Sequence, residues 1–384
     1  MTEHALLSAS GSSRWMKCPP SARLEEVIED EPSEYAKEGS FAHSLAELNL
    51  CYSLGNISKA QFNKELKKIK KNSFYTEEMK EYVQVYVDFA IEKINEGKAH
   101  TKDAIVLLEM KLDYSPWVPE GFGTGDLVIV TDKALEIIDL KYGKGVKVSA
   151  KDNSQMRLYA LGAIHQFDCL YDIKTVKMTI AQPRLDSIST DELSIEELLT
   201  WAEKEVKCKA ELAFKGEGEF KAGEHCRFCK VKPTCRARRD ENMKLSYMDF
   251  KEPPLLTDEE IAEVLFSVGE LQKWAKDVEV YAYNKAVNEG KKWPGLKLVE
   301  GRNSRKFRSE SEVAKLLLEA GYEEDKIYSK SLLSLTALEK SIGKKNFNEI
   351  LVDLITRTPG KLKLVPEEDK RPEVKNTAEA DFKS

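Results

Sequence analysis

Four short segments of apolar and β-branched residues lie in the middle of the chain, and they constrain its fold more than any other feature. They are residues 104–112, 123–130, 134–141 and 175–182. Their length and composition predict β-strands. Residues 151–165, between the third and fourth segments, have the periodicity of an amphipathic helix. Three neighbouring strands, a helical crossover and a further strand predict an α/β fold in which helices flank a mixed sheet.

Helical patterns surround this central region. Residues 35–54 and 76–96 precede the strands, with a lysine-rich link between them, and residues 194–215 follow the strands. The sequence Thr257-Asp258-Glu259-Glu260 predicts a capping box at the start of one long helix over residues 257–289. Beyond it we expect a hairpin over residues 295–307 and further helices to about residue 356.

This pattern divides the chain of 384 residues into three parts. Residues 1–245 form the main domain, into which a helical segment is inserted at about residues 45–100. Residues 250–360 form a mainly helical C-terminal domain. The polar, proline-containing residues 361–384 are expected to be a flexible tail. A hydrophobic fraction of 41% excludes wholesale disorder.

The charge balance bears on partners and compartment. Sixty Lys and Arg residues oppose 66 Asp and Glu residues, and this net charge of −6 argues against a general nucleic-acid coat protein. Two basic patches, residues 58–72 and 227–239, are each most simply explained as a solvated face. The chain shows no secretory signal and no apolar run of about 18 residues. Seven cysteines suit cytosolic thiols or metal ligands, so we expect a cytoplasmic protein with no membrane partner.

Two acids and a lysine interrupt the second and third predicted strands. Asp139 and Lys141 are two residues apart, so they share one face, and an antiparallel neighbour would bring Asp126 close to them. Buried carboxylates need compensation, and a divalent Mg²⁺ or Mn²⁺ supplies it through oxygen ligands. Such a site is suited to metal-assisted hydrolysis of a phosphodiester. The alternative is a simple salt bridge between Asp139 and Lys141 at the edge of a strand.

Other polar residues belong to the same region of the sequence. Gln155 and Tyr159 are four residues apart and share one face of the crossover helix. His43 lies four residues after Gly39 on the helix that precedes the sheet, where a neutral imidazole can bind a metal, although a lone histidine is more often structural. The position of Glu109 in the first predicted strand makes it a candidate for an additional acid of this site, but a role at the surface is the favoured interpretation.

A second constellation consists of cysteines. Cys226, Cys229 and Cys235 follow one another at x₂ and x₅ spacing, and three thiolates need a fourth ligand to complete a metal site. The candidates for that ligand are Cys18, Cys51, Cys169, Cys208 and His225. Cys51 and Cys169 fit buried thiols, whereas Cys208 lies on a helix near the cluster and stays possible. Cys18 lies in an irregular loop before Pro19 and Pro20.

The series Gly39-x-x-x-His43, Gly125-Asp126, Asp139-x-Lys141 and Gln155-x-x-x-Tyr159 resembles the RecB-like branch of the PD-(D/E)XK nucleases. The resemblance implies a restriction-endonuclease-like sheet and a metal held by His43, Asp126 and Asp139. It also implies that Lys141 assists the attacking water, and that Gln155 and Tyr159 contact DNA or organise the site. Asp139 stands where many relatives have Glu, a difference that shifts the metal slightly.

The cysteines resemble those of the iron–sulfur subset of this branch, which has one cysteine before the nuclease core and three after it. The resemblance implies that Cys18, Cys226, Cys229 and Cys235 hold a [4Fe–4S] cluster with a structural role. Zinc bound by the same cysteines, or by three of them and His225, is the alternative. The basic residues around these cysteines then become plausible phosphate contacts.

The whole chain is similar to an uncharacterised phage and prophage family of RecB-like proteins. That similarity implies a metal-dependent DNA exonuclease that acts on single strands or free ends in phage recombination or replication, in a bacterial host cell. Its partners would include a phage single-strand-binding protein, polymerase or helicase. A non-catalytic DNA-binding or scaffolding protein on a nuclease fold, and the nuclease subunit of a helicase–nuclease complex, are the alternatives. The chain has no phosphate loop of its own to drive a motor.

Overall fold

The computed structural model describes residues 5–29, 33–244, 257–299, 309–329, 332–351 and 354–355. The chain divides into two compact units, Met1–Asn284 and Lys285–Ser384. This division falls within the long helix α10 (Asp258–Glu289), whereas the sequence pattern placed a boundary near residue 250. The expected tail, residues 361–384, and most of the expected hairpin, residues 295–307, lie outside the described residues.

A five-stranded mixed sheet forms the centre of the larger unit, with its strands in chain order from one edge to the other. The strands are β1 (Ile105–Asp113), β2 (Phe122–Val130), β3 (Ala134–Leu140), β4 (Thr175–Gln182) and β5 (Ser187–Ser194). Only β3 and β4 are parallel, and the helix α6 (Ser154–Phe167) connects them. The predictions of a mixed sheet and of a helical crossover are therefore confirmed.

The edge strand β5 was missed by the sequence prediction because it lacks an apolar run. Its sequence, SISTDELS, is mostly polar, and it pairs with β4 alone. Asp186 precedes it in the left-handed conformation (φ 46°) and reverses the chain after β4. A strand with one unpaired edge can be polar along much of its length, since it has no second neighbour to cover its outer side.

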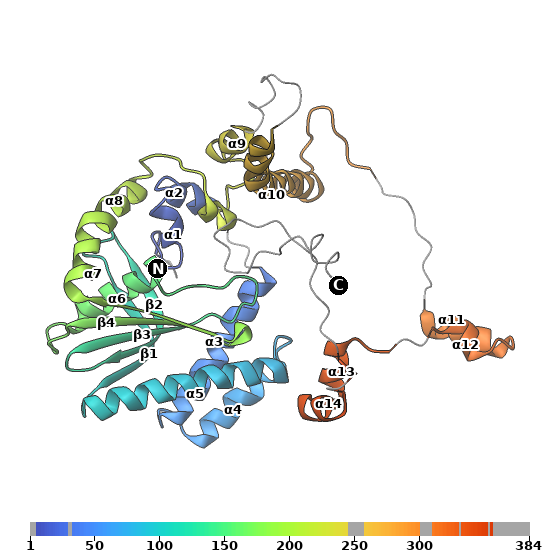
Figure 1. Cartoon of the computed structure of the whole chain (residues 1–384), viewed down its shortest axis with the longest axis horizontal. Coiled ribbons are helices and arrows are strands. Elements are labelled where there is room, and N and C mark those ends of the chain that lie inside the picture. Colours follow the sequence, from blue (N-terminus) through green and yellow to red (C-terminus); the bar gives the residue numbers. More distant parts are fainter. Residues whose placement is uncertain are drawn as a thin grey trace, which may run out of the picture. The chain divides into compact units, whose positions relative to one another are not determined.

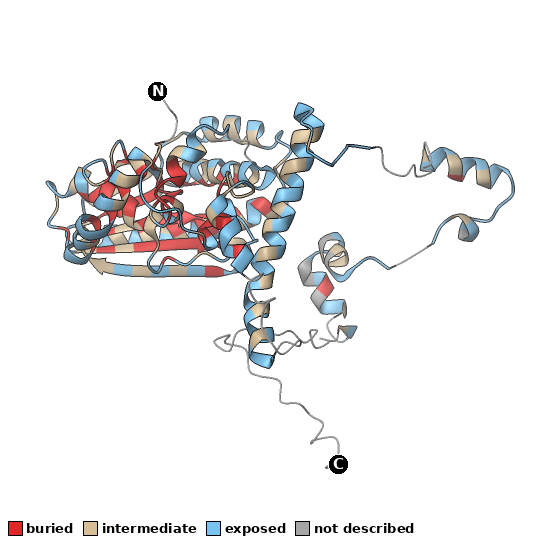
Figure 2. Cartoon of the chain, turned by 90° about the horizontal axis from the view of Figure 1, so that it is seen from above, coloured by how far each residue is buried: buried red, intermediate tan, exposed pale blue. Residues whose placement is uncertain are grey.

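Helices cover both faces of the sheet, and each layer buries its own core (Figures 1 and 2). We call one the α6-side core; it includes side chains from α6 and from the N-terminal segment, such as Leu7 and Trp15. The other, the α3-side core, joins the sheet to α3 (Glu34–Ser53) and α5 (Glu77–His100). The helices α1 (Ser12–Trp15), α2 (Ser21–Glu26), α7 (Ile195–Trp201) and α8 (Lys207–Lys215) complete the α6 side.

The lysine-rich link predicted between two helices is itself a helix, α4 (Lys59–Ile69). Ser58 and Gln61 form a capping box at its start. Phe62 stacks on Tyr52 of α3, with ring centroids 4.4 Å apart. The inserted segment therefore contains three helices, and charged residues form most of the outer surface of α4.

Ion pairs of one buried arginine attach α10 to the segment that follows the cysteines. Arg238, on α9 (Arg236–Met243), is 2% exposed. Its guanidinium donates to Glu270 at 2.9 Å and to Asp277 at 2.6 Å. Lys232 also pairs with Asp277, at 3.0 Å.

The capping box predicted at Thr257 is confirmed. The Thr257 N–H donates to the Glu260 carboxylate, and the Glu260 N–H donates to the Thr257 hydroxyl.

The second unit is mainly helical in its described residues, which confirms the prediction for the C-terminal region. It contains α11 (Glu310–Glu319), α12 (Glu324–Ile327), α13 (Leu335–Ile342) and α14 (Lys344–Leu351). Across both units, no described helix combines the length and the apolar character that a membrane span requires.

Two helical glycines make a matched test of how α6 packs on the sheet. A Cβ added at Gly162 of α6 would lie 2.9 Å from Leu112 Cβ and 3.0 Å from the Leu112 backbone carbon, neither of which can rotate away. We therefore expect Gly162→Ala to lower the free energy of unfolding by about 1–3 kcal/mol. Gly39→Ala on α3 is the control; its Cβ would meet nothing within 4 Å, and it should gain up to about 1 kcal/mol. Urea unfolding followed by circular dichroism measures both, and equal effects would contradict the packing described.

Candidate metal centre

The candidate centre begins where β2 and β3 separate. Their pairing starts at Leu127 and Ile138 and continues toward the hairpin turn. Beyond that point the backbone N–H of Leu140 donates to Asp126 Oδ2 at 2.7 Å. The carboxylate of Asp126 thus accepts the hydrogen bond that a strand carbonyl would otherwise accept, and its second oxygen stays available.

Asp139 and Lys141 share a face, as their spacing predicts, and form a close ion pair. Lys141 Nζ lies 2.9 Å from Asp139 Oδ2, and the Asp139 side chain is 3% exposed. Burial opposes the charge of Lys141, but Asp139 outweighs it and holds the pKa of Lys141 above its usual range. Lys141 is therefore an ammonium ion fixed beside a buried carboxylate.

The Gln155 side chain links this ion pair to α6. Its Oε1 accepts from Lys141 Nζ at 3.2 Å, and its Nε2 donates to Asp139 Oδ1 at 3.3 Å and to the Tyr159 hydroxyl at 3.1 Å. Asn153 caps the helix start, accepting from the N–H groups of Gln155 and Met156. The predicted face of Gln155 and Tyr159 therefore turns toward Asp139 and Lys141.

A glycine makes room for Tyr159. A Cβ at Gly123 of β2 would lie 2.8 Å from Tyr159 Cε1. Burial raises the pKa of the Tyr159 hydroxyl well above its usual range, so this group stays protonated. A side chain at position 123 would therefore keep Tyr159, and with it this face of α6, from approaching the sheet so closely.

His43 approaches from the opposite layer. It lies on α3, and its Nδ1 is 3.2 Å from Asp126 Oδ1. Burial disfavours the imidazolium, yet the charge of Asp126 and their hydrogen bond outweigh burial and raise the pKa of His43 to about 9. In the metal-free protein, His43 therefore carries a proton that a bound metal would replace.

Glu109 is half-buried and lies in this group, whereas a role at the surface was favoured for it. It has a left-handed backbone conformation in β1, with φ 48°. Burial first, and then the nearby Asp126, raise the pKa of Glu109 to about 7. One ligand atom from each of His43, Glu109 and Asp126 lies within 4.8 Å of the other two.

The expected site residues therefore fall into two adjoining sets. His43 and Asp126 meet as expected, with Glu109 added to them. Asp139 lies against Lys141 and Gln155 instead. Carboxylate oxygens and one imidazole suit Mg²⁺ or Mn²⁺. For Glu109, the signal in the sequence is limited to an acid within an apolar strand.

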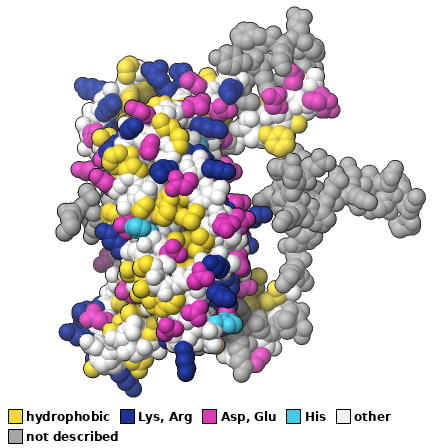
Figure 3. Space-filling model, turned by 90° about the vertical axis from the view of Figure 1, so that its left-hand side faces the viewer, with side chains coloured by type: hydrophobic (Ala, Val, Ile, Leu, Met, Phe, Trp, Pro, Cys, Tyr) yellow, Lys and Arg dark blue, Asp and Glu magenta, His cyan; other side chains and the backbone are white. Residues whose placement is uncertain are grey.

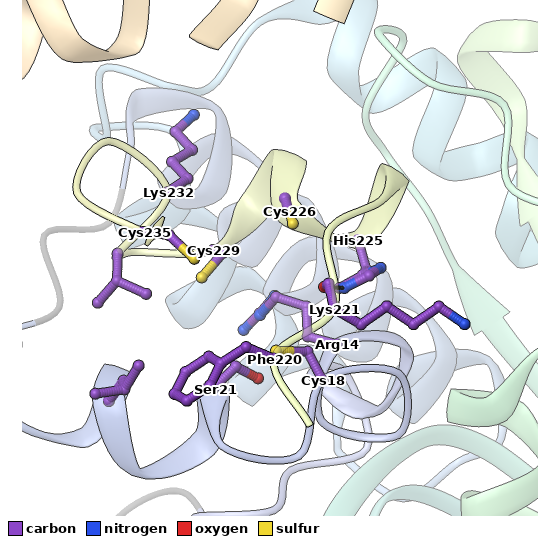
Figure 4. A pocket seen from close by; sticks show the side chains of 12 residues that line it. Arg14, Cys18, Ser21, Phe220, Lys221, His225, Cys226, Cys229, Lys232 and Cys235 are labelled. Atoms are coloured by element: carbon purple, nitrogen blue, oxygen red, sulfur yellow. Dashed lines mark hydrogen bonds between the residues drawn. The ribbon is translucent and has the colours of Figure 1, made fainter. Parts of the chain in front are cut away.

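The four expected cysteines line one pocket. Sticks in Figure 4 show the sulfurs of Cys18, Cys226, Cys229 and Cys235 around a common space. The first three of these residues are each 8% exposed. Burial raises the pKa of Cys18 and Cys226, and that of Cys229 to about 12. Without a metal these three thiols stay protonated, so a metal must displace their protons.

The other candidates for the fourth ligand lie in positions less suited to binding a metal in this pocket. Cys169 is exposed, so the expectation that it is buried is wrong, and Cys51 is half-buried. Cys208 is exposed and does not line the pocket. His225 does line it, but its Nε2 is engaged with the Lys221 carbonyl at 2.8 Å.

The basic residues near the cysteines separate into two groups. Lys232 and Arg238 pair with acids of α10, so those charges are used within the protein. Arg227, Arg236 and Arg239 are exposed, and Arg239 pairs with its neighbour Asp240. The patch is therefore partly structural, and only its exposed members are open to a phosphate.

Residues 4–372 match the model of a family described as "Protein of unknown function (DUF2800)". The chain belongs to this family.

One solved structure similar to this DUF2800 member is the crystal structure of SSO0001. The two share 10% sequence identity with a TM-score of 0.24, over 59% of this chain and 96% of SSO0001. A likeness of this size carries no argument about the fold or activity of the DUF2800 protein.

The His43–Asp126 pair makes a prediction about pH in this DUF2800 protein. A pKa raised from 6.5 to about 9 contributes stability that is full below the lower value and is lost as pH rises through the higher one. His43→Gln should therefore cost more at about pH 6 than at about pH 10, by roughly 1–3 kcal/mol. Urea unfolding with EDTA present measures this. An equal cost at both pH values would show that Asp126 does not hold the imidazolium.

Proposed function

We propose that this protein is a metal-dependent deoxyribonuclease of the RecB-like PD-(D/E)XK type. One observation carries the proposal: Asp126, Asp139 and Lys141 converge where two strands separate, within reach of His43 from another layer. A mere salt bridge between Asp139 and Lys141 would not account for the second carboxylate or for the imidazole. The combination of carboxylates and an ammonium ion is suited to phosphodiester hydrolysis.

The residues fit a divalent cation on the chemistry of their donor atoms. Glu109 and Asp126 are both carboxylates in a partly buried space, and burial together with the charge of Asp126 raises the pKa of Glu109. A divalent cation bound by His43, Asp126 and a further acid would offset that repulsion. When bound, such a cation lowers the pKa of a coordinated water and neutralises charge on a phosphate.

The chain's own groups supply the remainder of the chemistry. Lys141 presents a fixed ammonium that can donate to a phosphate oxygen as negative charge develops there. Gln155 holds both Lys141 and Asp139, so it sets the direction of the ammonium. Tyr159 in turn fixes the Gln155 amide through its hydroxyl.

The substrate we propose is DNA with free ends or single-stranded DNA, cleaved as an exonuclease in phage recombination or replication. The proposal gains support from the exposed Arg227 and Arg236, which phosphates can reach. On the face drawn in Figure 3, Lys and Arg side chains are interspersed with Asp and Glu side chains. A polyanion would therefore find local basic contacts instead of a uniformly basic coat.

We also propose that Cys18, Cys226, Cys229 and Cys235 hold a [4Fe–4S] cluster, with zinc as the rival. The pocket brings together one cysteine that precedes the sheet in the sequence and three that follow it. Glu25 of α2 supports the arrangement by accepting from the backbone N–H of Lys230 at 2.7 Å. A metal bound there would close a very long loop and stabilise the fold.

Cleavage of end-labelled linear DNA tests the activity. Wild-type protein with Mg²⁺ or Mn²⁺ should release label, and EDTA should stop it. Lys141→Ala should slow release by about 10²–10³-fold because it removes the fixed donor. Lys174→Ala is the matched control, since Lys174 pairs with Asp172 on the surface. If Lys141→Ala cleaves as fast as the control, the site is misassigned.

Metal analysis of protein purified without oxygen tests the cysteine pocket. We expect about four iron atoms per chain and visible absorption. Cys226→Ser should lose both, and Cys208→Ser, at an exposed cysteine outside the pocket, should keep both. Stoichiometric zinc without iron in the wild type would replace the cluster by its rival.

A further inference from the structure

We propose that Glu109 is a ligand of the catalytic cation and that the Tyr86 hydroxyl holds a water or other ligand bound to that cation. The cation centre then consists of His43, Glu109 and Asp126, while Asp139 serves to fix Lys141. The inference rests on the proposed function for the identity of the cation, but the site is argued from the positions of its residues. Neither Glu109 as a ligand nor any role for Tyr86 follows from the motifs in the sequence.

The backbone of β1 turns Glu109 toward His43. Leu107 packs against the α6-side core and Leu108 against the α3-side core, as alternation along a strand requires. Regular alternation would return Glu109 to the α6 side. Its left-handed conformation breaks the alternation, and Glu109 instead lines a pocket with Leu50 and Tyr86 of the α3-side core.

That conformation is uncommon for a residue other than glycine, asparagine or aspartate. The neighbouring pairs, Leu108 with Leu127 and Met110 with Gly125, keep their register on either side of it. The strand therefore changes direction at a single residue and then resumes. Such local deviations concentrate at functional sites, and here the deviation places a carboxylate beside His43 and Asp126.

Tyr86 supplies an independent observation. It lies on α5, is 2% exposed, and lines the same pocket as His43, Glu109 and Asp126. Its hydroxyl has no hydrogen-bond partner among the described residues. A buried hydroxyl without a partner is destabilising, so a polar group is expected in the pocket when the protein is active. A water bound to the cation would be such a group.

Asp139 lies against Lys141 and Gln155. Its Oδ1 accepts from Gln155, and its Oδ2 forms an ion pair with Lys141 Nζ at 2.9 Å but accepts no hydrogen bond from the described residues. Asp126, in contrast, has one oxygen bonded to the Leu140 N–H and the other facing His43. Of the two strand aspartates, Asp126 is thus the one with an oxygen directed toward Glu109 and the imidazole. His43, Glu109 and Asp126, from three different elements, would hold the cation, and the cation would supply a binding site for water and a phosphate.

Binding of Mn²⁺ to the full chain, without DNA, tests the proposal. Isothermal titration and the loss of the free Mn²⁺ signal in electron paramagnetic resonance both measure affinity. Glu109→Gln should weaken Mn²⁺ binding by about 100-fold. Glu47→Gln is the matched control, because Glu47 lines the same pocket but is exposed and outside the ligand set. Its effect should stay below about threefold. Equal effects of the two variants would overturn the proposal.

Two further variants test the assignments of Tyr86 and Asp139. Tyr86→Phe should raise the melting temperature of the metal-free protein and weaken Mn²⁺ binding by about tenfold. Unchanged Mn²⁺ affinity would leave the hydroxyl without the proposed role. Asp139→Asn should weaken Mn²⁺ binding less than Glu109→Gln does; the reverse order would place the cation at Asp139.

The result is separable from the proposed function. If Lys141→Ala abolishes DNA cleavage while Glu109→Gln binds Mn²⁺ normally, the nuclease stands and the role of Glu109 is wrong. If Mn²⁺ binding depends on Glu109 but the wild type cleaves no DNA, the cation site stands and the nuclease proposal is wrong.

Discussion

The hydrogen bond from the Leu140 N–H to Asp126 is the interaction on which the geometry of the candidate centre depends. It occurs where the pairing of β2 and β3 has ended, and a side chain takes the place of a strand carbonyl. A charge-assisted bond of this kind is stronger than the ladder bond it replaces. The two strands can therefore separate without leaving a buried N–H unpaired, and the gap between them admits His43 from α3 and Lys141 from the end of β3.

The parallel pairing of β3 with β4 has a second consequence. Parallel neighbours require a crossover, and α6 provides it. The crossover starts close to the carboxyl end of β3, so Gln155, in the first turn of α6, reaches Asp139 and Lys141. Strand order thus determines which side chains orient the lysine, and the close contact of α6 with β1 at Gly162 keeps that helix in place.

The parts of this structure that the sequence predicted are those marked by apolar content or spacing. The strands β1 to β4 and the crossover follow from hydrophobic pattern, and the alignment of Asp139 with Lys141 follows from the period of a strand. The helix α4 was missed because its exposed face is lysine-rich and its one clear signal is the Ser58–Gln61 capping box. The position of Glu109 beside His43 and Asp126 was missed for a different reason: a left-handed conformation at a glutamate has no signature in residue type. Likewise, no pattern shows that Arg238 faces α10, since its ion pairs join residues more than thirty positions apart.

The cysteine pocket and the candidate centre are connected through the N-terminal segment. Cys18 follows α1, whose Ser12 is 1% exposed and shares a hydrogen bond of 2.7 Å with Ser154, the residue before Gln155. The same segment contributes Leu7 and Trp15 to the α6-side core, and the Leu7 carbonyl accepts from the Tyr114 hydroxyl. A metal bound by Cys18 would therefore restrain the segment against which the start of α6 packs. Through Ser154 and Gln155, such a metal would act on the orientation of Lys141 without touching it.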